Sequence, residues 1–588
     1  MPGVAVTGAP QIPSRYKWIA LSNTTLGMLM ATLNATSLII ALPVIFRGIQ
    51  LNPLDPANFG YLLWMLMGYM LVTAVLVVTL GRLGDMFGRV RMYNLGFVIF
   101  TLGAIGASAA WSTGSAGAIE LIAMRMLQSV GGAMLMANSA AILTDAFPDT
   151  QRGMALGINQ MAGLTGSFLG ILVGGVISQL GWRWVFLFNV PIGVLGTAWA
   201  YWRLREIGIH TPQRIDWLGN VTFAAGLAML LVGITYGISP YGSSAMGWTN
   251  PFVIGMIGGG VLVLLAFCFI EPRVAAPMFN MSLFRIRPFA AGNLAGLLSA
   301  IGRGGLQFML IMWLQGIWLP IHGYDFRVTP LWSGIYMIPS TVGFIIAGPL
   351  SGWLSDKYGA RPFATGGMLL AAASFGLMML LPADFAYPVF ALVLLLNGIA
   401  FGMFAAPNTA GIMNSVPARY RGAASGMRST FQNTGTPLSI GVFFSLMIVG
   451  LTASVPHALL TGLTANHVPT SLAARLAALP PVGYLFASFL GYNPLQTLLG
   501  PHVLSSLPAA NAARLTSRTF FPGLIAAPFK QGLVIVLSFS IVMCLIAAVA
   551  SWMRGGRYVH KEDEGTESVS RATPSPGGHA PTGARAAM

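Results

Sequence analysis

Long apolar segments alternate with short polar ones along most of the chain. One apolar segment, YLLWMLMGYMLVTAVLVVTL (61–80), ends at a charged turn, GRLGDMFGRVRMY (81–93), and another, LGFVIFTLGAIGASAAW (95–111), follows it. About 20 apolar residues span a bilayer as a helix, because a helix satisfies its own backbone hydrogen bonds. The pattern predicts fourteen spans, at residues 18–46, 60–80, 92–111, 117–143, 153–178, 184–202, 217–236, 251–270, 288–317, 331–354, 362–381, 386–413, 423–450 and 531–553.

The composition is typical of a multi-pass membrane protein surrounded by a lipid bilayer. Charged residues make up 8% of the 588, about a third of what a soluble protein carries. The net charge of +16 does not indicate nucleic-acid binding, because most Lys and Arg fall on one side of the predicted spans. The positive-inside rule makes that side the cytoplasm and places both termini there, which predicts a cytoplasmic (plasma) membrane protein.

The sequence offers no pattern for a cofactor or a metal. Cys268 and Cys544 both lie inside predicted spans, where they are expected to pack as small apolar residues. Two classes of membrane protein fit the sequence poorly. A membrane-embedded enzyme would need a reactive cluster, which is missing, and a receptor would need an output domain, for which the C-terminal tail is too short to form a core. We therefore expect a protein that is not an enzyme.

Two segments recur about 270 residues apart. In the first, Gly81, Leu83, Asp85, Phe87 and Gly88 match Gly352, Leu354, Asp356, Tyr358 and Gly359. In the second, Asn138, Ile142, Pro148, Arg152, Gly153 and Gly157 match Asn408, Ile412, Pro417, Arg421, Gly422 and Gly426. The offset covers an even number of spans, so both copies face the same side, and the chain is expected to hold two six-helix halves in parallel repeat.

The repeat divides the chain into five parts. We expect disordered cytoplasmic tails at 1–16 and 554–588, six-helix halves at 17–205 and 288–553, and two inserted helices with their linkers at 206–287. The second half contains an outer loop, 451–530, which is too long and too apolar for a simple linker. Short interfacial helices that cover the outer mouth are expected there, with a disordered loop as the alternative.

The repeated turn, G-x-L-x-D-x-x-G-R, resembles the signature loop of the major facilitator superfamily. The fourteen spans are similar in layout to the drug:proton antiporter branch, and MRMLQSVGG (124–132), GSFLGILVGG (166–175) and GWRWVFLFNVPIG (181–193) agree with it. The resemblance implies an all-α secondary active transporter that exports amphipathic small molecules by alternating access. A lipid exporter or facilitator without proton coupling is the alternative. We expect a monomer.

The resemblance also implies that the charged turn forms a gate. Gly81 and Gly88 would allow a tight turn. Asp85 would face the start of the thirteenth span near Arg421–Ala424, and Arg89 would pair with Asp145. In the second copy, Asp356, Gly359 and Arg361 would face the start of the fifth span, near Arg152–Gly153. Gly170, Gly174 and Gly175 would belong to the antiporter motif of that span. Ordinary positive-inside charge plus a turn would explain the arginines but not the two matched aspartates.

A few polar residues within spans are candidates for a substrate cavity, because buried charge is costly in a membrane. Arg125 fits an arginine that the family implicates in proton movement and substrate response. For Arg303 a cavity-lining and a structural role both stay open. Further polar candidates are Asn34, Gln128, Asn138, Gln307, Gln315, Asn408, Gln432 and Asn433, of which about half are expected to make only interhelical hydrogen bonds. Candidate aromatic walls are Trp64, Tyr69, Trp313 and Trp318, with positions at the membrane interface as the alternative.

Two departures from the family pattern bear on coupling. Asn34 stands where a carboxylate is usual, and an amide does not titrate near neutral pH. Ile171 replaces a proline in the fifth span, which removes an expected helix distortion. Glu120 is then the one carboxylate placed within a span, so any proton coupling is expected to run through Glu120 and Arg125. With arginines and no mid-membrane carboxylate, the cavity is expected to prefer neutral or anionic substrates over cations.

Overall fold

The computed structural model describes residues 15–52, 55, 58–207, 215–242, 244, 246–275, 277–417, 420–491 and 493–555. Inside its helices it leaves out the side chains of Asp149, Thr150, Arg152, Gly153, Leu164, Asp356, Arg421 and Gly422. Nearly all of the two expected tails, and the side chains invoked at Asp356, Arg152 and Arg421, therefore lie outside the described part.

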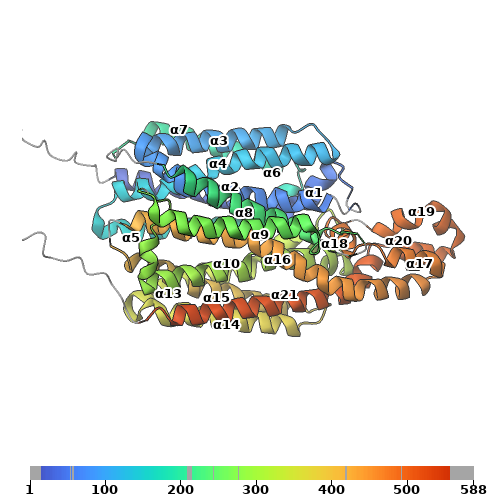
Figure 1. Cartoon of the computed structure of the whole chain (residues 1–588). Coiled ribbons are helices and arrows are strands. Elements are labelled where there is room, and N and C mark those ends of the chain that lie inside the picture. Colours follow the sequence, from blue (N-terminus) through green and yellow to red (C-terminus); the bar gives the residue numbers. More distant parts are fainter. Residues whose placement is uncertain are drawn as a thin grey trace, which may run out of the picture.

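Fourteen helices in the described part are long and apolar enough to cross a membrane, and no strand forms there. They run side by side along one axis (Figure 1). This confirms the predicted all-α, fourteen-helix fold. The end of the bundle where α1 begins and α21 finishes is called the termini face, and the opposite end the extension face.

The N-terminal half consists of six membrane crossings. They are α1 (Tyr16–Gly48), α2 (Phe59–Phe87), α3 (Arg89–Ala109), α4 (Gly114–Ala146), α5 (Asp149–Ser178) and the joined pair α6 (Trp184–Leu187) and α7 (Asn189–Arg203). Helix α5 runs without a break through Ile171, which is buried. Tyr16, expected in the tail, is instead the first residue of α1 and is buried, because its hydroxyl bonds the backbone of Arg205.

The C-terminal half repeats the arrangement. Its crossings are α10 (Arg287–Trp313) continued by η4 (Leu314–Trp318) and α11 (Leu319–Ile321), then α12 (Thr329–Tyr336) with α13 (Ile338–Tyr358), α14 (Ala360–Leu380), α15 (Tyr387–Asn414), α16 (Arg421–Thr464) and α21 (Phe520–Trp552). The repeat extends to backbone detail, since the two matched glycines that end α2 and α13, Gly88 and Gly359, both have positive φ, 109° and 88°. Only glycine adopts this conformation without strain.

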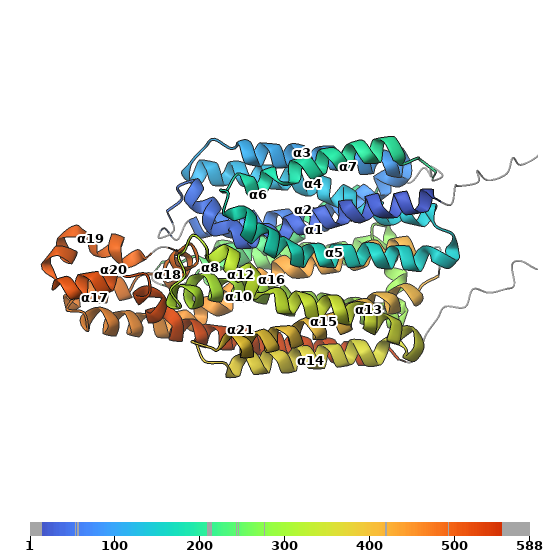
Figure 2. The same cartoon turned by 180° about the vertical axis from the view of Figure 1, so that it is seen from behind.

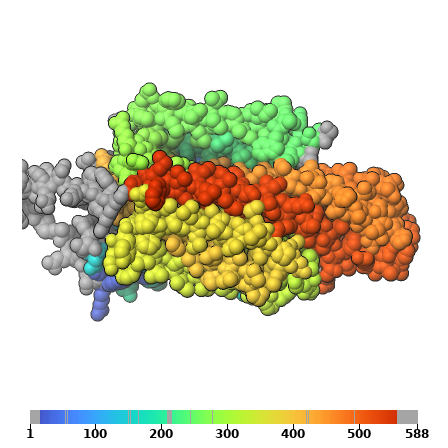
Figure 3. Space-filling view, turned by 90° about the horizontal axis from the view of Figure 1, so that it is seen from below, coloured from blue at the N-terminus to red at the C-terminus, as the bar shows by residue number. Residues whose placement is uncertain are grey.

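Two inserted helices, α8 (Trp217–Ile238) and α9 (Pro251–Ile270), form a hairpin between the halves in sequence. The short 3₁₀ helices η2 (Glu271–Arg273) and η3 (Met281–Arg285) lead from it to α10. The space-filling view shows the hairpin as a green ridge along one side of the C-terminal half (Figure 3). Its α9 exposes large apolar side chains such as Leu262 and Phe269, as expected for a lipid-facing helix.

The predicted outer loop is helical and projects from the bundle. It contains α17 (Thr470–Ala477), α18 (Pro481–Phe489), α19 (Pro494–Ser506) and α20 (Ala509–Thr516). Helix α16 continues 14 residues beyond its predicted end and α21 begins 11 residues before its predicted start. These projecting helix ends and α17, α19 and α20 form an extension, orange in Figures 1 and 2. Helices continue here past the predicted spans because partner helices cover their apolar sides.

Helices α1 and α5 pack unusually closely along a row of glycines. A Cβ at Gly170 would overlap Thr36 Oγ1 and the Leu33 carbonyl, and one at Gly174 would overlap the backbone of Ser37. Small residues allow such close approach in lipid, where dispersion and hydrogen bonding drive helix association. The antiporter-motif glycines therefore fix the two helices of the N-terminal half that lie nearest to α12.

We predict that Gly170→Ala lowers the thermal stability of the purified protein, at a cost of about 1–3 kcal/mol, because the added methyl group has no space. The matched control is Gly258→Ala on the exposed side of α9, where a Cβ would meet nothing within 4 Å. Thermal unfolding in detergent measures both. Equal midpoints for the two variants would contradict the close packing of α1 on α5.

Candidate functional site

The two halves close against each other at the extension face. A Cβ at Gly175 would lie 2.7 Å from the Pro330 carbonyl oxygen, and one at Gly334 would lie 3.1 Å from the Ile171 carbonyl oxygen. Helices α5 and α12 therefore meet backbone to backbone. The Ile171 carbonyl therefore faces α12 of the other half.

Gln315 joins the halves at the same level. Its side-chain amide donates to the Ile40 carbonyl at 3.3 Å and to Ser333 Oγ at 2.9 Å. Gln315 lies in η4, a π-helical turn, and such turns often mark functional positions in membrane helices. Gln315 thus makes interhelical hydrogen bonds at the extension face, and its cavity role stays a prediction.

Helix α18 fills the remaining space between the halves at this face. Its residues are all buried. Phe486 packs edge-on against Phe46 of α1 at 5.4 Å between ring centroids and against Phe59 of α2 at 5.9 Å. On the other side, Ser488 donates to the Gly316 carbonyl at 2.7 Å, and Phe489 contacts Phe308. Part of the predicted outer loop thus lies between the halves, where it closes the extension face.

A polar cluster lies inside the N-terminal half. Arg125 of α4 is 1% exposed and donates to Asn34 Oδ1 and, at 3.1 Å, to Gln128 Oε1. Its guanidinium also lies over the Tyr69 ring, 4.6 Å from the centroid. Among the described residues, Nε and Nη2 of Arg125 and Nε2 of Gln128 are buried without hydrogen-bond partners. Four predicted residues are thus brought together, with three buried donor nitrogens that an acceptor could bind.

Arg303 of α10 lies in a cage of aromatic rings. Its guanidinium carbon is 4.8, 5.0 and 5.4 Å from the centroids of Phe168, Phe401 and Phe344. Within the described residues it makes no hydrogen bond or ion pair. Phe168 belongs to α5 and the other two rings to the C-terminal half, so Arg303 lies where the halves meet. It also lines, with Gln307 and Asn397, a cavity of about 20 Å³, room for one water molecule.

Arg428 of α16 also joins the halves, and the sequence analysis did not single it out. It donates to Gln160 of α5 at 2.7 Å and to Gln432 at 3.2 Å. Its Nε is buried, and no described residue accepts a hydrogen bond from it. Arg428 lies within a predicted span, and that position near the span's end is the signal that could have identified it.

Several other candidates occupy packing positions. Asn138 bonds the Met134 and Leu80 carbonyls and fills the space beside Gly84, while Trp313 is buried against Phe385. Asn408 accepts a hydrogen bond from Arg554, which the predicted boundary placed in the tail but which is 5% exposed. Trp64 is half-buried on α2, and Nδ2 of Asn433 is buried without a partner. Trp318 stacks on Phe385 and bonds its carbonyl.

Glu120 does not join the cluster of Arg125. Its carboxylate accepts a hydrogen bond from the Ser112 backbone at 3.2 Å, in the connection between α3 and α4. Arg125 is five positions further along α4, which places the two side chains on different faces of the helix. The predicted Glu120–Arg125 pair is therefore not formed in this structure.

The signature turn is held by three carboxylates around Arg89. Arg89 forms ion pairs with Asp85 at 2.7 Å and with Asp145 at 2.5 Å, the second being the pair expected from the sequence. Glu206, which the sequence analysis did not single out, accepts from the backbone amides of Arg89 and Val90, both at 2.9 Å. The Glu206 carboxylate thus accepts hydrogen bonds from backbone amides at the N-terminus of α3 that have no partner within the helix.

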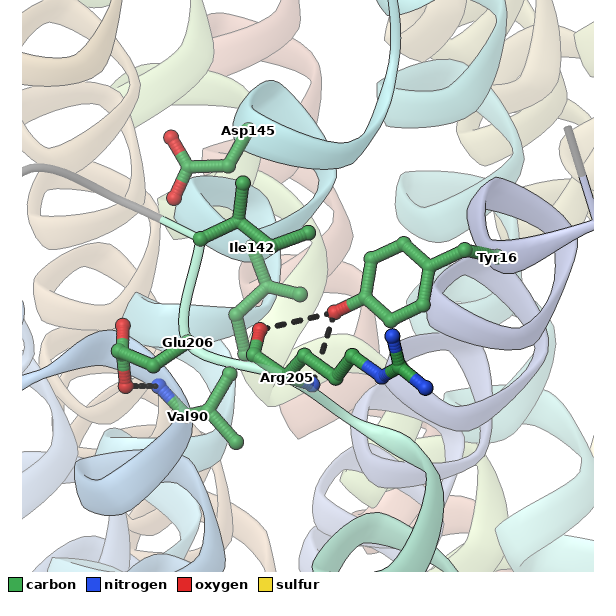
Figure 4. A pocket seen from close by; sticks show the side chains of 7 residues that line it. Tyr16, Val90, Ile142, Asp145, Arg205 and Glu206 are labelled. Carbon is green, nitrogen blue, oxygen red and sulfur yellow. Dashed lines mark hydrogen bonds between the residues drawn. The ribbon is translucent and has the colours of Figure 1, made fainter. Parts of the chain in front are cut away.

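A shallow pocket lies beside these groups, and Figure 4 shows Glu206 and Asp145 on one side of it and Tyr16 on the other. Both ion pairs of Arg89 stay within the N-terminal half. The contact of Asp85 with the start of α16 and the gating role of Gly81 remain predictions.

The second copy of the turn differs in its contacts. Arg361 lies over the Trp552 ring of α21, 3.7 Å from the centroid, within the C-terminal half. Gly359 keeps the conformation of Gly88, whereas the Asp356 side chain lies outside the described part. The repeated backbone is therefore preserved, but the arginine that follows it has a different neighbour.

A family model for the Major Facilitator Superfamily matches residues 24–216 and 212–440, which together cover most of the chain. The chain belongs to the Major Facilitator Superfamily. The tetracenomycin C resistance and export protein of Streptomyces glaucescens is 29% identical to this chain over 76% of this chain and 78% of its own length. The multidrug transporter protein MdtP of Bacillus subtilis is 25% identical over 88% of this chain and 91% of its own length. The riboflavin transporter RibZ of Clostridioides difficile is 28% identical over 74% of this chain and 90% of its own length.

Solved structures agree on the major facilitator fold. A bacterial homologue of the human lysosomal transporter Spinster, in an inward-facing and unoccupied conformation, has a TM-score of 0.55 and 16% identity, covering 92% of this chain and 98% of that one. A POT family transporter in complex with 5-aminolevulinic acid has a TM-score of 0.53 and 14% identity, covering 84% and 98%.

For this major facilitator protein we predict that α18 must separate from α1 during transport. In a variant lacking Cys268 and Cys544, Phe46→Cys with Phe486→Cys should be bridged by a short, reducible bifunctional thiol reagent. Transport should fall at least about tenfold and return on reduction, since the bridge holds the extension face closed. Phe486→Cys alone is the control. Unimpaired transport by the bridged protein would show that α18 does not open.

Proposed function

We propose that this protein exports neutral or anionic amphipathic small molecules across the cell membrane by alternating access. The observation that carries the proposal is Arg303, a cation in an aromatic cage between the two halves, with no carboxylate in contact with it among the described residues. A cage of this kind offers apolar surface for a ring system and one positive charge for an acidic group. These are the two features of an anionic amphiphile.

The sign of the charge decides which substrates bind best. At a separation of 4 Å and an effective dielectric constant near 20, two unit charges interact by about 4 kcal/mol. A bound cation would meet this repulsion from Arg303, whereas an anion would gain the attraction. Arg125 and Arg428 also contribute buried donor nitrogens without partners. Buried donors favour ligands that bring acceptors.

Export is supported by the conformation and by the relatives. The extension face is sealed by α5, α12 and α18, so a substrate would enter this state from the termini face. If the positive-inside rule holds, the termini face is cytoplasmic, and substrate is loaded from the cytoplasm. The names of the tetracenomycin C export protein and of MdtP refer to export and to multidrug transport. We propose a multi-pass monomer with both termini in the cytoplasm that performs transport rather than catalysis.

A facilitator or lipid exporter without proton coupling is the second candidate. It is favoured by Asn34, which takes the place of a titratable side chain and bonds Arg125. Glu120, bound to a backbone amide in the α3–α4 connection, gives no support to coupling at the cavity. Proton linkage in the first candidate therefore requires a carboxyl group elsewhere in the protein.

We predict that Arg303→Gln lowers the transport of an anionic amphiphile about tenfold relative to its neutral ester, since tenfold corresponds to only about 1.4 kcal/mol of lost attraction. The measurement is uptake into proteoliposomes of three compounds with one ring system, bearing a carboxylate, an ester or a quaternary ammonium group.

The control is Arg475→Gln, which removes an exposed arginine from α17 and should leave all three rates unchanged. An equal loss for all three compounds in Arg303→Gln would mean that Arg303 is structural. Fastest transport of the quaternary ammonium compound by the unaltered protein would overturn the proposed substrate class.

A further inference from the structure

Two carboxyl groups are buried together at the base of the inserted hairpin. Asp216 is 3% exposed and begins α8, and Glu271 is 0% exposed and directly follows α9. Both would lie within 3 Å of a Cβ at Gly219, and Asp216 is within hydrogen-bonding reach of Glu271. Nothing in the transport cycle proposed above uses them.

Three of the four carboxyl oxygens bind backbone amides. Asp216 Oδ1 accepts from Gly219 at 2.7 Å, Asp216 Oδ2 accepts from Met278 at 3.2 Å, and Glu271 Oε1 accepts from Phe279. The fourth oxygen, Glu271 Oε2, is buried, and no described donor reaches it. An ionised carboxylate oxygen in this position would be both desolvated and adjacent to a second negative charge.

The two acids lie at opposite kinds of helix end, which stabilise a negative charge to different degrees. Asp216 caps the N-terminus of α8, where the helix dipole and the free amides stabilise a negative charge. Glu271 lies at the C-terminal end of α9, where the same dipole disfavours one. A proton on Glu271 Oε2 would remove the unfavourable charge and could donate a hydrogen bond to Asp216. Each of the four carboxyl oxygens would then take part in a hydrogen bond.

Few other titratable groups face this pair from the described elements. Arg82 of α2, in the signature turn, interacts with both acids and donates to the Pro277 carbonyl. Asp85 in turn interacts with Arg82, and Cys268 lies near Glu271 on α9. From α16, the apolar side chain of Phe431 packs against Phe279 at 5.7 Å between ring centroids.

We propose that Asp216 and Glu271 form a proton-binding site that holds one exchangeable proton at Glu271 Oε2 and links it to the signature turn. This inference rests on the proposed transport function for its role in coupling, although the site itself does not depend on it. When the proton leaves, the O–H bond of Glu271 breaks, water accepts the proton, and two carboxylates remain. A movement of Arg82 from Pro277 toward these carboxylates would stabilise that state.

The location explains how such a proton could act on transport. The segment 277–279 is held by the acids through two amides and by Arg82 through one carbonyl. Its Phe279 contacts α16 of the C-terminal half, while Arg82 belongs to the N-terminal half. Protonation and the position of the turn therefore influence each other, because each changes what Arg82 can bind.

The test is pH-difference infrared spectroscopy on the full-length protein in lipid, with protons as the only added ligand. We expect a protonated carboxyl band near neutral pH that is absent in Glu271→Gln and in Asp216→Asn and is kept in the control Asp384→Asn, which alters an exposed acid. Glutamine resembles protonated glutamate in shape and donor capacity, so Glu271→Gln should fold. Arg82→Gln should keep the band to higher pH. Identical spectra for the unaltered protein and Glu271→Gln would overturn the site.

Transport assays distinguish a failure of the coupling role from a failure of the proposed function. In proteoliposomes, Glu271→Gln should reduce accumulation driven by a pH gradient at least about tenfold but leave counterflow within about twofold. Full gradient-driven accumulation by Glu271→Gln would overturn the coupling role. If the unaltered protein shows no counterflow of any of the three test compounds, the proposed function fails, while the infrared result still decides whether the proton site exists.

Discussion

Three arginines inside the bundle, Arg125, Arg303 and Arg428, contact no carboxylate among the described residues, and the proposed selectivity depends on this constraint. Arg125 is held by two amides and a tyrosine ring, Arg303 by three phenylalanine rings, and Arg428 by glutamines. Cation–π contacts and neutral acceptors stabilise a guanidinium but leave its charge unneutralised. We propose that the region between the halves therefore keeps a net positive potential, which would favour the binding of an anionic ligand over a cationic one.

The same surfaces that form this region also determine which face is closed. Glycines of α5 allow it to pack on α1 and to meet α12 through backbone contacts, and α18 fills the space that remains. Contacts of this kind are numerous but individually weak, which suits a face that must open and close. Close packing inside the N-terminal half keeps that half rigid while its contacts with the other half exchange.

The sequence was sufficient for the fold and for part of the candidate site. Apolar segments of about 20 residues determine where helices cross a membrane, so all fourteen crossings were predicted. The Arg89–Asp145 pair and the cluster of Asn34, Tyr69, Arg125 and Gln128 combine residues that the sequence analysis had also selected.

Other features depend on contacts that no local pattern reveals. The helical ends beyond residues 450 and before 531 were missed because they are stabilised by packing in the extension rather than by lipid. The Arg303 cage combines three helices, and Asp216 meets Glu271 across 55 residues of chain. Glu120 was expected to couple with Arg125 because it was the one carboxylate placed within a span, but the two side chains lie on different faces of α4.

The measurement that tests the central claim most directly is a cryo-EM map of the protein with an anionic amphiphile bound. The account predicts density for the acidic group against the Arg303 guanidinium, with the ring system between Phe168 and Phe401. Density for the ligand elsewhere, with the Arg303 cage unchanged, would contradict it.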